Sequence, residues 1–339
     1  MVKNIVLIII VISTLNCGEN IFNENIQFKY SNPIGAINLT KDYKEYENFT
    51  PGWSEDCSYI IYLTRITKNV EIPKYIVNKL DLINKEKYSY NIKYFSEFYG
   101  PPVISPDGRW FVYSGGIPGN NFDIYRVDAN NPEGEPERLT YKGYSNGDGV
   151  LSPDGQWIAF TSQREPHIQT GSEVYIMKFE PESSINEPTR LTFHDKNGSF
   201  CENLLFSPDD NWILYTCTRG QNNVIYKINL SNGMQAQEEI IVKDVDYITP
   251  TDISPDGKWI AIFYRIKIHT KDGNQLVIGY VSSDSGEQEI HDFFPTLEEG
   301  CDCWSPSFSP DGKWVSFVSE MENKEGETDI FLYPFNPEE

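Results

Sequence analysis

Short apolar runs alternate along most of the chain with polar segments that are rich in turn-forming residues. Two such runs are 110–113 and 157–160, and neither shows a strict alternation of apolar and polar positions. A continuous apolar run is typical of a strand that is buried on both faces of its sheet. The pattern therefore predicts many short β-strands in sheets that are covered on both sides.

A Ser-Pro-Asp-Gly turn precedes the apolar run in each of several repeats. Pro favours the first turn position, Asp accepts hydrogen bonds from backbone N–H groups, and Gly adopts the positive φ that a tight turn requires. The copies recur at intervals of 47 to 55 residues, which predicts six structural repeats. Five copies lie at 105–110, 152–157, 207–212, 254–259 and 309–314, and a degenerate sixth lies at 53–59.

Two further strands follow the turn hairpin in the repeats. A third strand is predicted at 123–127, 173–177, 224–228 and 329–333, and a fourth at 137–140 and 190–192. Four short strands in each repeat of about 50 residues describe one blade of a β-propeller. The fold class is therefore predicted to be all-β, a six-bladed propeller with four-stranded blades over residues 36–339.

The last repeat lacks the Arg-Leu-Thr strand that its predecessors carry. The segment 36–40, Ala-Ile-Asn-Leu-Thr, resembles that strand. We expect it to pair with the strand at 329–335 and to close the ring, because closure removes an exposed sheet edge.

The first residues have the pattern of an export signal. Lys3 precedes an apolar run over 5–15, which is shorter than the roughly 20 residues of a membrane-spanning helix. The run ends before Cys17 and resembles a bacterial lipoprotein signal, which implies cleavage after residue 16 and lipidation of Cys17. Residues 17–35 are then a tether, and the protein is expected on the bacterial cell envelope, at the outer membrane, facing the periplasm or the exterior. Simple secretion and an uncleaved anchor are the alternatives.

The Ser-Pro-Asp-Gly turns, the Ile-Tyr strands and the Leu-Thr strands closely resemble the WD40-like repeats of the TolB family. The resemblance covers residues 36–339 and implies a propeller of the kind found in the Tol–Pal envelope system. The chain is expected to depart from that family by having no N-terminal α/β domain. The same repeats occur in propellers attached to serine peptidases and in some polysaccharide lyases, so the resemblance specifies the fold more closely than the function.

The amino-acid composition limits the kinds of partner that the protein is expected to bind. The 339 residues include 28 basic and 50 acidic side chains, a formal net charge of −22 at pH 7. This charge opposes extended contact with nucleic acid or with an anionic lipid surface. We expect a monomer that contacts the membrane through its N-terminal lipid and that binds an envelope protein or peptide.

The sequence carries only weak signals of catalysis or of metal binding. Gly143 to Gly147 match the Gly-x-Ser-x-Gly nucleophile elbow around Ser145, but they lie in a predicted loop, so no enzyme activity is predicted. No cofactor is predicted either. Acidic residues near the innermost strands could instead hold a Ca²⁺ ion in the central channel, or form a solvated rim. They are Asp148, Asp195, Glu202, Asp246, Asp252 and Asp302.

Six cysteines are present, and one of them is the lipidation site. Cys201 and Cys217 lie symmetrically about the turn at 207–211 and should face each other across a hairpin. Export makes a disulfide between them plausible, and two buried thiols are the alternative. Cys57 is expected to be unpaired.

The connections from the outermost strand of one blade to the innermost strand of the next are rich in aromatic and acidic residues. This mixture suits protein recognition. The sequence therefore predicts an envelope-anchored propeller that binds a protein or peptide, in a scaffold role like that of the Tol–Pal system. A propeller that binds a glycan or small ligand in its channel is the alternative, and an enzyme related to peptidases or lyases is a weaker one. The predicted partner-binding residues are Tyr99, Tyr144, Asp148, His194, Glu202, Tyr247, Glu298, Glu299, Asp302 and Trp304.

Overall fold

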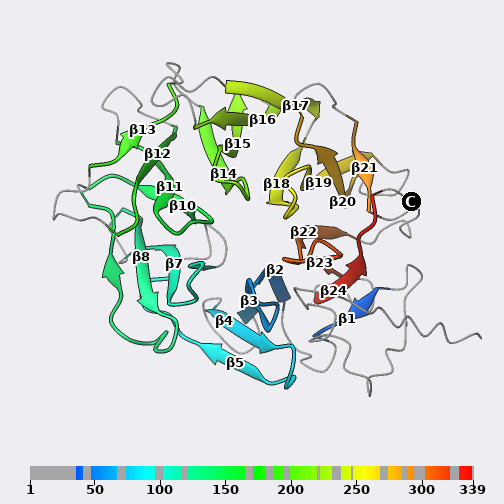
Figure 1. The fold of residues 1–339 in the computed structure, drawn as a ribbon, viewed down its shortest axis with the longest axis horizontal. Coiled ribbons are helices and arrows are strands. Elements are labelled where there is room, and N and C mark those ends of the chain that lie inside the picture. The colour runs from blue at the N-terminus through cyan, green and yellow to red at the C-terminus, as the bar shows by residue number, and fades with distance from the viewer. Residues whose placement is uncertain are drawn as a thin grey trace, which may run out of the picture.

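The computed structural model shows six four-stranded antiparallel sheets arranged as blades around a common centre (Figure 1). This arrangement confirms the predicted all-β, six-bladed propeller. No helix long and apolar enough to cross a membrane occurs in the part of the chain that the structure describes. The described residues are 36–40, 47–66, 74–95, 102–116, 121–141, 143–164, 171–180, 187–193, 199–219, 222–230, 238–245, 247–267, 274–284, 289–293, 302–320 and 328–337.

Blades 1 to 5 are each built from four consecutive strands, with the first strand innermost. Blade 1 contains β2 (Glu47–Trp53), β3 (Tyr59–Ile66), β4 (Lys74–Asp81) and β5 (Lys87–Tyr90). Blade 2 contains β6 (Val103–Ile104), β7 (Trp110–Gly115), β8 (Asp123–Asp128) and β9 (Glu137–Arg138). Blade 3 contains β10 (Asn146–Leu151), β11 (Trp157–Ser162), β12 (Glu173–Lys178) and β13 (Thr189–Arg190).

The second half of the ring follows the same plan. Blade 4 contains β14 (Phe200–Phe206), β15 (Trp212–Arg219), β16 (Asn222–Asn229) and β17 (Glu238–Val245). Blade 5 contains β18 (Ile248–Ile253), β19 (Trp259–Lys267), β20 (Asn274–Ser282) and β21 (His291–Asp292). Blade 6 contains β22 (Cys303–Phe308), β23 (Trp314–Ser319), β24 (Asp329–Pro334) and, from the other end of the chain, β1 (Ile37–Asn38).

The repeated turn joins the first and second strands of each blade. In blade 5 the Ser254 hydroxyl donates to Asp256 Oδ1 at 2.6 Å and accepts from the backbone N–H of Trp259 at 2.9 Å. Gly257 has a φ of 73°, as the sequence predicts for this position. A Cβ atom on Gly257 would lie 3.9 Å from the ring of Pro208, so successive turns sit side by side around the ring.

The predicted closure of the ring is confirmed by the pairing of β1 with β24. Ile37 lies opposite Leu332, and the Thr40 hydroxyl donates to Asp329 Oδ1 at 2.6 Å. Blade 2 has the same contact within itself, where the Thr140 hydroxyl donates to Asp123 Oδ1 at 2.7 Å. The N-terminal segment therefore supplies to blade 6 the threonine that other blades take from their own fourth strand.

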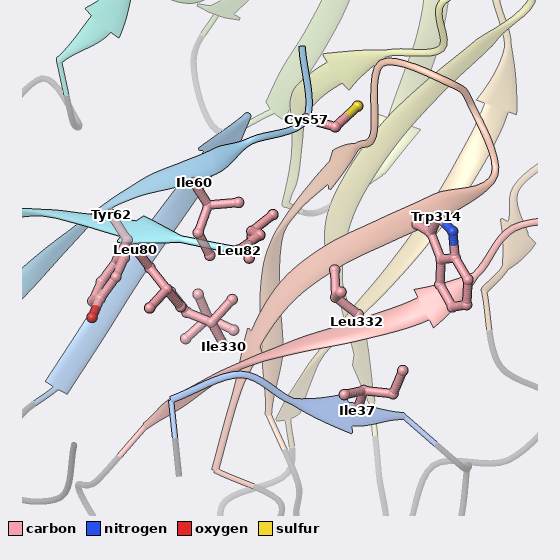
Figure 2. Packing of buried hydrophobic residues seen from close by; sticks show 10 residues of the cluster. Ile37, Cys57, Ile60, Tyr62, Leu80, Leu82, Trp314, Ile330 and Leu332 are labelled. Atoms are coloured by element: carbon pink, nitrogen blue, oxygen red, sulfur yellow. The ribbon is translucent and has the colours of Figure 1, made fainter. Parts of the chain in front are cut away.

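Buried apolar side chains fill the space between neighbouring blades. Figure 2 shows this packing at the closure, where Ile37 of β1 and Leu332 of β24 lie near Ile60 of β3 and Leu80 of β4. All four are at most 5% exposed. Truncating one such side chain to Ala costs about 2–5 kcal/mol, so the closure is stabilised by packing as well as by hydrogen bonds.

Candidate functional site

The innermost strands of several blades carry a bulge near the centre of the ring. The register shifts in β10, β14 and β22, and each bulge contains a non-glycine residue in the left-handed region: Asp148 (φ 48°), Asn203 (φ 56°) and Ser305 (φ 51°). A bulge bends its strand and redirects a side chain. The repeat thus places a polar residue at the same position of three innermost strands.

Asp148 extends from blade 3 toward blade 4. Its carboxylate accepts hydrogen bonds from the backbone N–H of Asn203 and from the Thr161 hydroxyl. Burial raises the pKa of Asp148 to about 7, and the neighbouring Glu202 carboxylate adds to the rise, whereas the two hydrogen bonds oppose it. The charges of two predicted site residues, Asp148 and Glu202, therefore form an interacting pair across neighbouring blades.

Glu202 is the second member of this pair. Burial also raises its pKa. It lies directly opposite Thr216 in the pairing of β14 with β15, so the two side chains are on the same face of the blade. Thr216 is 0% exposed, and its hydroxyl has no hydrogen-bond partner in the structure.

Asp252 of β18 also reaches the next blade, but its surroundings differ. One oxygen accepts the Ser307 hydroxyl and the backbone N–H of Phe308, each at 2.8 Å, and the other accepts the backbone N–H of Ile253 at 2.8 Å. Burial raises the pKa of Asp252 to about 6, and these hydrogen bonds limit the rise. Asp252 therefore joins blade 5 to blade 6.

The other predicted partner-binding residues are distributed around the ring. Tyr144 is exposed just before β10, and Tyr247 is partly buried with the guanidinium of Arg265 5.0 Å from its ring centroid. Asp302 accepts the backbone N–H of Leu276 at 3.0 Å, and Trp304 packs against the core cluster between blades 6 and 1. The remaining ones lie outside the described residues: Tyr99, His194, Glu298 and Glu299, and so does Cys17.

Exposed aromatic rings gather where one blade connects to the next. Eight large hydrophobic side chains are exposed in the described part of the chain. Four of them lie on connections from a fourth strand to the following first strand, and a fifth, Phe200, is the first residue of the innermost strand β14. Such connections lie at one face of a propeller. We call these five residues the aromatic rim: Tyr94, Tyr141, Tyr144, Phe193 and Phe200.

Two rings of the rim are held in place by arginines. The guanidinium of Arg138 is 5.3 Å from the ring centroid of Tyr141, and that of Arg190 is 4.7 Å from the ring centroid of Phe193. Both arginines also form ion pairs with acidic residues on the third strand of their blade, Arg138 with Asp123 and Arg190 with Glu173. The two rings are 58% and 59% exposed, so the arginines fix their orientation without covering them.

The described residues contain no group of three or more His, Cys, Asp or Glu side chains that could hold a metal ion. The described members of the alternative Ca²⁺ set do not form such a group: Asp148, Glu202, Asp252 and Asp302. Asp195 and Asp246 lie outside the described residues. Ser145 lies in the loop between β9 and β10, directly before β10. It does not occupy the strand-to-helix turn of a nucleophile elbow.

The structure confirms one of the predictions for the cysteines and contradicts another. Cys201 and Cys217 lie opposite each other in the hairpin, as predicted, and they are present as thiols with their sulfur atoms 3.3 Å apart. The hydrogen bond between them and their burial raise the pKa of Cys201. The disulfide between them stays a prediction. The expectation that Cys57 is unpaired is wrong, because Cys57 is disulfide-bonded to a partner outside the described residues.

Sequence reasoning missed the three bulges, Thr216, and two members of the rim, Tyr94 and Phe200. Bulges have no distinct sequence pattern, and the only available signal was the tolerance of Asp and Asn for positive φ. Phe200 directly precedes Cys201, so the predicted hairpin could have placed it at the start of an innermost strand.

No protein-family model and no curated protein matches the sequence. Among solved structures, TolB from Acinetobacter baumannii matches with a TM-score of 0.56 at 21% identity, over 85% of this chain and 65% of that one. A putative TolB from Agrobacterium tumefaciens matches with a TM-score of 0.55 at 18% identity, over 86% of this chain and 91% of that one. A gluconolactonase from Xanthomonas campestris, XC5397, matches with a TM-score of 0.55 at 15% identity, over 91% of this chain and 94% of that one.

This chain thus spans just under two thirds of the length of the Acinetobacter protein. An oligogalacturonate lyase in complex with manganese also matches, with a TM-score of 0.52 at 15% identity, over 86% of this chain and 77% of that one. These identities show the fold: the chain has a TolB-like propeller. Binding proteins and enzymes share this scaffold, so the function has to be argued from the site.

Proposed function

We propose that the protein is an envelope-tethered propeller that binds a protein or peptide at the face carrying the aromatic rim. The observation that carries this proposal is the set of five exposed rings, four on the blade connections and Phe200 at the start of β14. Exposed aromatic side chains are enriched at protein interfaces, where they bury a large area at a low entropy cost. The TolB-like fold supports a scaffold role.

The N-terminal sequence supports the tethering part of this proposal. The signal over residues 1–16 directs export, and lipid chains on Cys17 hold residues 17–35 and the propeller at the bacterial envelope, at the outer membrane. Lipidation converts the Cys17 thiol to a thioether, so that cysteine can no longer form a disulfide. Peptide mapping of the protein from its native membrane tests this part, because a Cys17–Cys57 disulfide would exclude the lipid.

Affinity capture from detergent-solubilised envelope tests the binding role. The bait is the chain from residue 17 with Cys17→Ser, and mass spectrometry identifies the retained proteins. We expect a stoichiometric protein that is lost when Tyr144 and Phe193 are both changed to Ala. Capture by this variant at the level of the parent would show that the rim is not the binding surface.

A matched variant controls for the loss of apolar surface. Ile83 and Ile240 are also exposed, at 54% and 38%, but they lie on the turn between β4 and β5 and on the outer strand β17. Changing both to Ala should leave capture unchanged. A second pair of charge reversals, Glu298→Lys and Glu299→Lys, tests whether the predicted acidic loop contributes to the same surface.

A further inference from the structure

Arg164 is a partly buried arginine that forms no ion pair in the described part of the chain. It lies just after β11, on the connection from the second to the third strand of blade 3. Because neighbouring strands of a blade run antiparallel, this connection lies at the same face as the connections from one blade to the next. Arg164 is therefore on the face that carries the aromatic rim.

The hydrogen bonds of this guanidinium go to neutral acceptors. Nε donates to the Ser162 hydroxyl at 2.9 Å, and Nη2 donates to Asn146 Oδ1 at 3.0 Å. An arginine carries five N–H groups, so the others have no acceptor among the described residues. Since Arg164 is partly exposed, these groups are open to a ligand.

Two rings hold the guanidinium in one orientation. Its central carbon lies 5.1 Å from the ring centroid of Phe160 on β11 and 4.6 Å from that of Tyr175 on β12. Burial lowers the pKa of Arg164, which means that its charge has lost part of its hydration. A guanidinium fixed in this way is pre-organised for an anion, because little side-chain entropy remains to be lost on binding.

Other arginines with little exposure in blades 2 and 3 have carboxylate partners. A guanidinium nitrogen of Arg126 lies 2.9 Å from a Glu137 oxygen, and one of Arg190 lies 3.1 Å from a Glu173 oxygen. Arg164 differs from them because its two acceptors are an amide and a hydroxyl. Its position thus has the stacking and the hydrogen bonds of a structural arginine without the counter-charge.

The nearby acidic side chains do not supply that charge. Asp123, on the other side of Asn146, accepts Asn146 Nδ2 at 3.0 Å and is ion-paired with Arg138. Glu187 is exposed and acts on Arg164 from beyond ion-pair distance. In a chain with a formal net charge of −22, an arginine left without an acidic partner is an exception that calls for a ligand.

The connection from blade 2 to blade 3 passes beside this arginine. It carries two rings of the aromatic rim, Tyr141 and Tyr144, which are 58% and 39% exposed. The Asn146 amide accepts from Arg164 through Oδ1 and donates through Nδ2 to the carbonyl oxygen of Tyr144 at 3.0 Å. One side chain thus links the guanidinium to the surface that is proposed to bind a peptide.

We infer that Arg164 is the recognition site for a carboxylate group of the bound peptide, with Tyr144 as the neighbouring apolar contact. The guanidinium N–H groups can donate to both oxygens of a carboxylate, which an ammonium group cannot do in the same fixed geometry. Asn146 and Ser162 position the guanidinium. The carboxylate is that of an acidic side chain or of the peptide C-terminus. This inference rests on the proposed peptide-binding function and specifies the chemistry of the partner.

Fluorescence anisotropy with three tetrapeptides that carry the same uncharged N-terminal fluorophore tests the site. They are Gly-Phe-Glu-Phe amide, Gly-Phe-Gln-Phe amide and Gly-Phe-Gln-Phe with a free C-terminus, and the protein is the chain used for capture. At about 0.15 M salt, we expect the parent to bind a peptide with a carboxylate about tenfold more tightly than the neutral peptide. The net charge of −22 alone predicts the opposite order.

The peptide that binds more tightly identifies the source of the carboxylate. Preference for the glutamate peptide indicates a side chain, and preference for the free C-terminus indicates a chain end. Equal affinity for all three peptides, or no measurable binding of any of them, would overturn the site. This comparison uses the parent chain and needs no substitution.

Substitutions of two arginines locate the preference. Arg164→Gln should abolish it. Arg164→Lys, which keeps the aliphatic stem between the rings if the first variant unfolds, should reduce it several-fold. The matched control is Arg109→Gln, which removes the same charge from an exposed arginine on the turn before β7 and should leave the preference unchanged. A preference that persists in Arg164→Gln, or that Arg109→Gln also removes, would contradict the assignment.

The two proposals fail in different ways. Capture of an envelope protein at the parent level by the Arg164→Gln bait overturns the carboxylate site and leaves the binding function. A carboxylate preference that depends on Arg164, without any captured protein, overturns the binding function and leaves the site.

Discussion

Asp148 and Asp252 both lie on innermost strands, four and two residues before the turn serine of their repeats, and their surroundings differ. Each is a partly buried carboxylate on an innermost strand that reaches the next blade. Asp252 meets three donors, two of them on blade 6, whereas Asp148 meets two donors and another carboxylate. The two carboxylates therefore have different roles: Asp252 fastens blade 5 to blade 6, and Asp148 contacts blade 4 under the influence of a second acidic side chain.

The largest expected effect comes from removing Asp252. Asp252→Ala leaves the Ser307 hydroxyl and the Phe308 N–H without their acceptor, which costs about 2–4 kcal/mol. Urea denaturation measures the loss. Asp148→Ala at pH 8 should cost much less, because the relief of repulsion from Glu202 offsets the lost hydrogen bonds. Equal destabilisation by the two substitutions would contradict the comparison.

A second, smaller effect is that the two carboxylates change the stability of the protein over different pH ranges. In the folded protein the pKa of Asp148 is about 7, against an ordinary value of 3.8. Between about pH 4 and pH 7 the unfolded chain has released this proton and the folded protein keeps it, so stability falls as pH rises through this window. Asp148→Asn removes that loss. Its stability relative to the parent should increase by about 1–3 kcal/mol between pH 5 and pH 8.

The same measurement on Asp252→Asn sharpens this result. Its pKa of about 6 places the window lower, so the relative stability should stop changing near pH 6. Denaturation curves at pH 5, 6, 7 and 8 distinguish the two variants. Identical pH profiles would contradict the difference between the pKa values of the two carboxyl groups.

The smallest expected effect is the difference in stability between substitutions of two threonines that occupy the same position in neighbouring blades. Thr161→Val removes a donor to Asp148 and should destabilise the protein by about 1 kcal/mol. Thr216→Val replaces an unpartnered hydroxyl with a methyl group of the same shape and should be neutral or slightly stabilising. Thermal melts check both. A clear loss of stability in Thr216→Val would show that its hydroxyl has a partner in solution.

The features that the sequence predicted correctly are the ones that depend on local chemistry. The Ser-Pro-Asp-Gly turns form because each turn uses its own residues, as Ser254 and Asp256 show. The closing strand at Ile37 was identified because it supplies the Leu-Thr pattern missing from the last repeat. The facing of Cys201 and Cys217 followed from symmetry about a turn.

The carboxylate pair could not be predicted in this way. Asp148 meets Glu202 because a bulge bends each of two innermost strands, and a bulge depends on the packing between blades. Asp148 and Asp252 were both recognised as acidic residues near the centre. Their different surroundings depend on what the next blade presents, Ser307 to Asp252 and Glu202 to Asp148, and both partners lie in the following repeat.

The position of β1 has a consequence for the order of folding. Its hydrogen bond from Asn38 to Asp329 joins residues that are 291 positions apart, which makes it among the slowest contacts for a growing chain to form. Blades 1 to 5 can assemble from neighbouring residues, but the ring stays open until β24 has been synthesised. Throughout synthesis the free edge of β1 is therefore exposed to pairing with other chains, and an early-acting chaperone or rapid export would protect it.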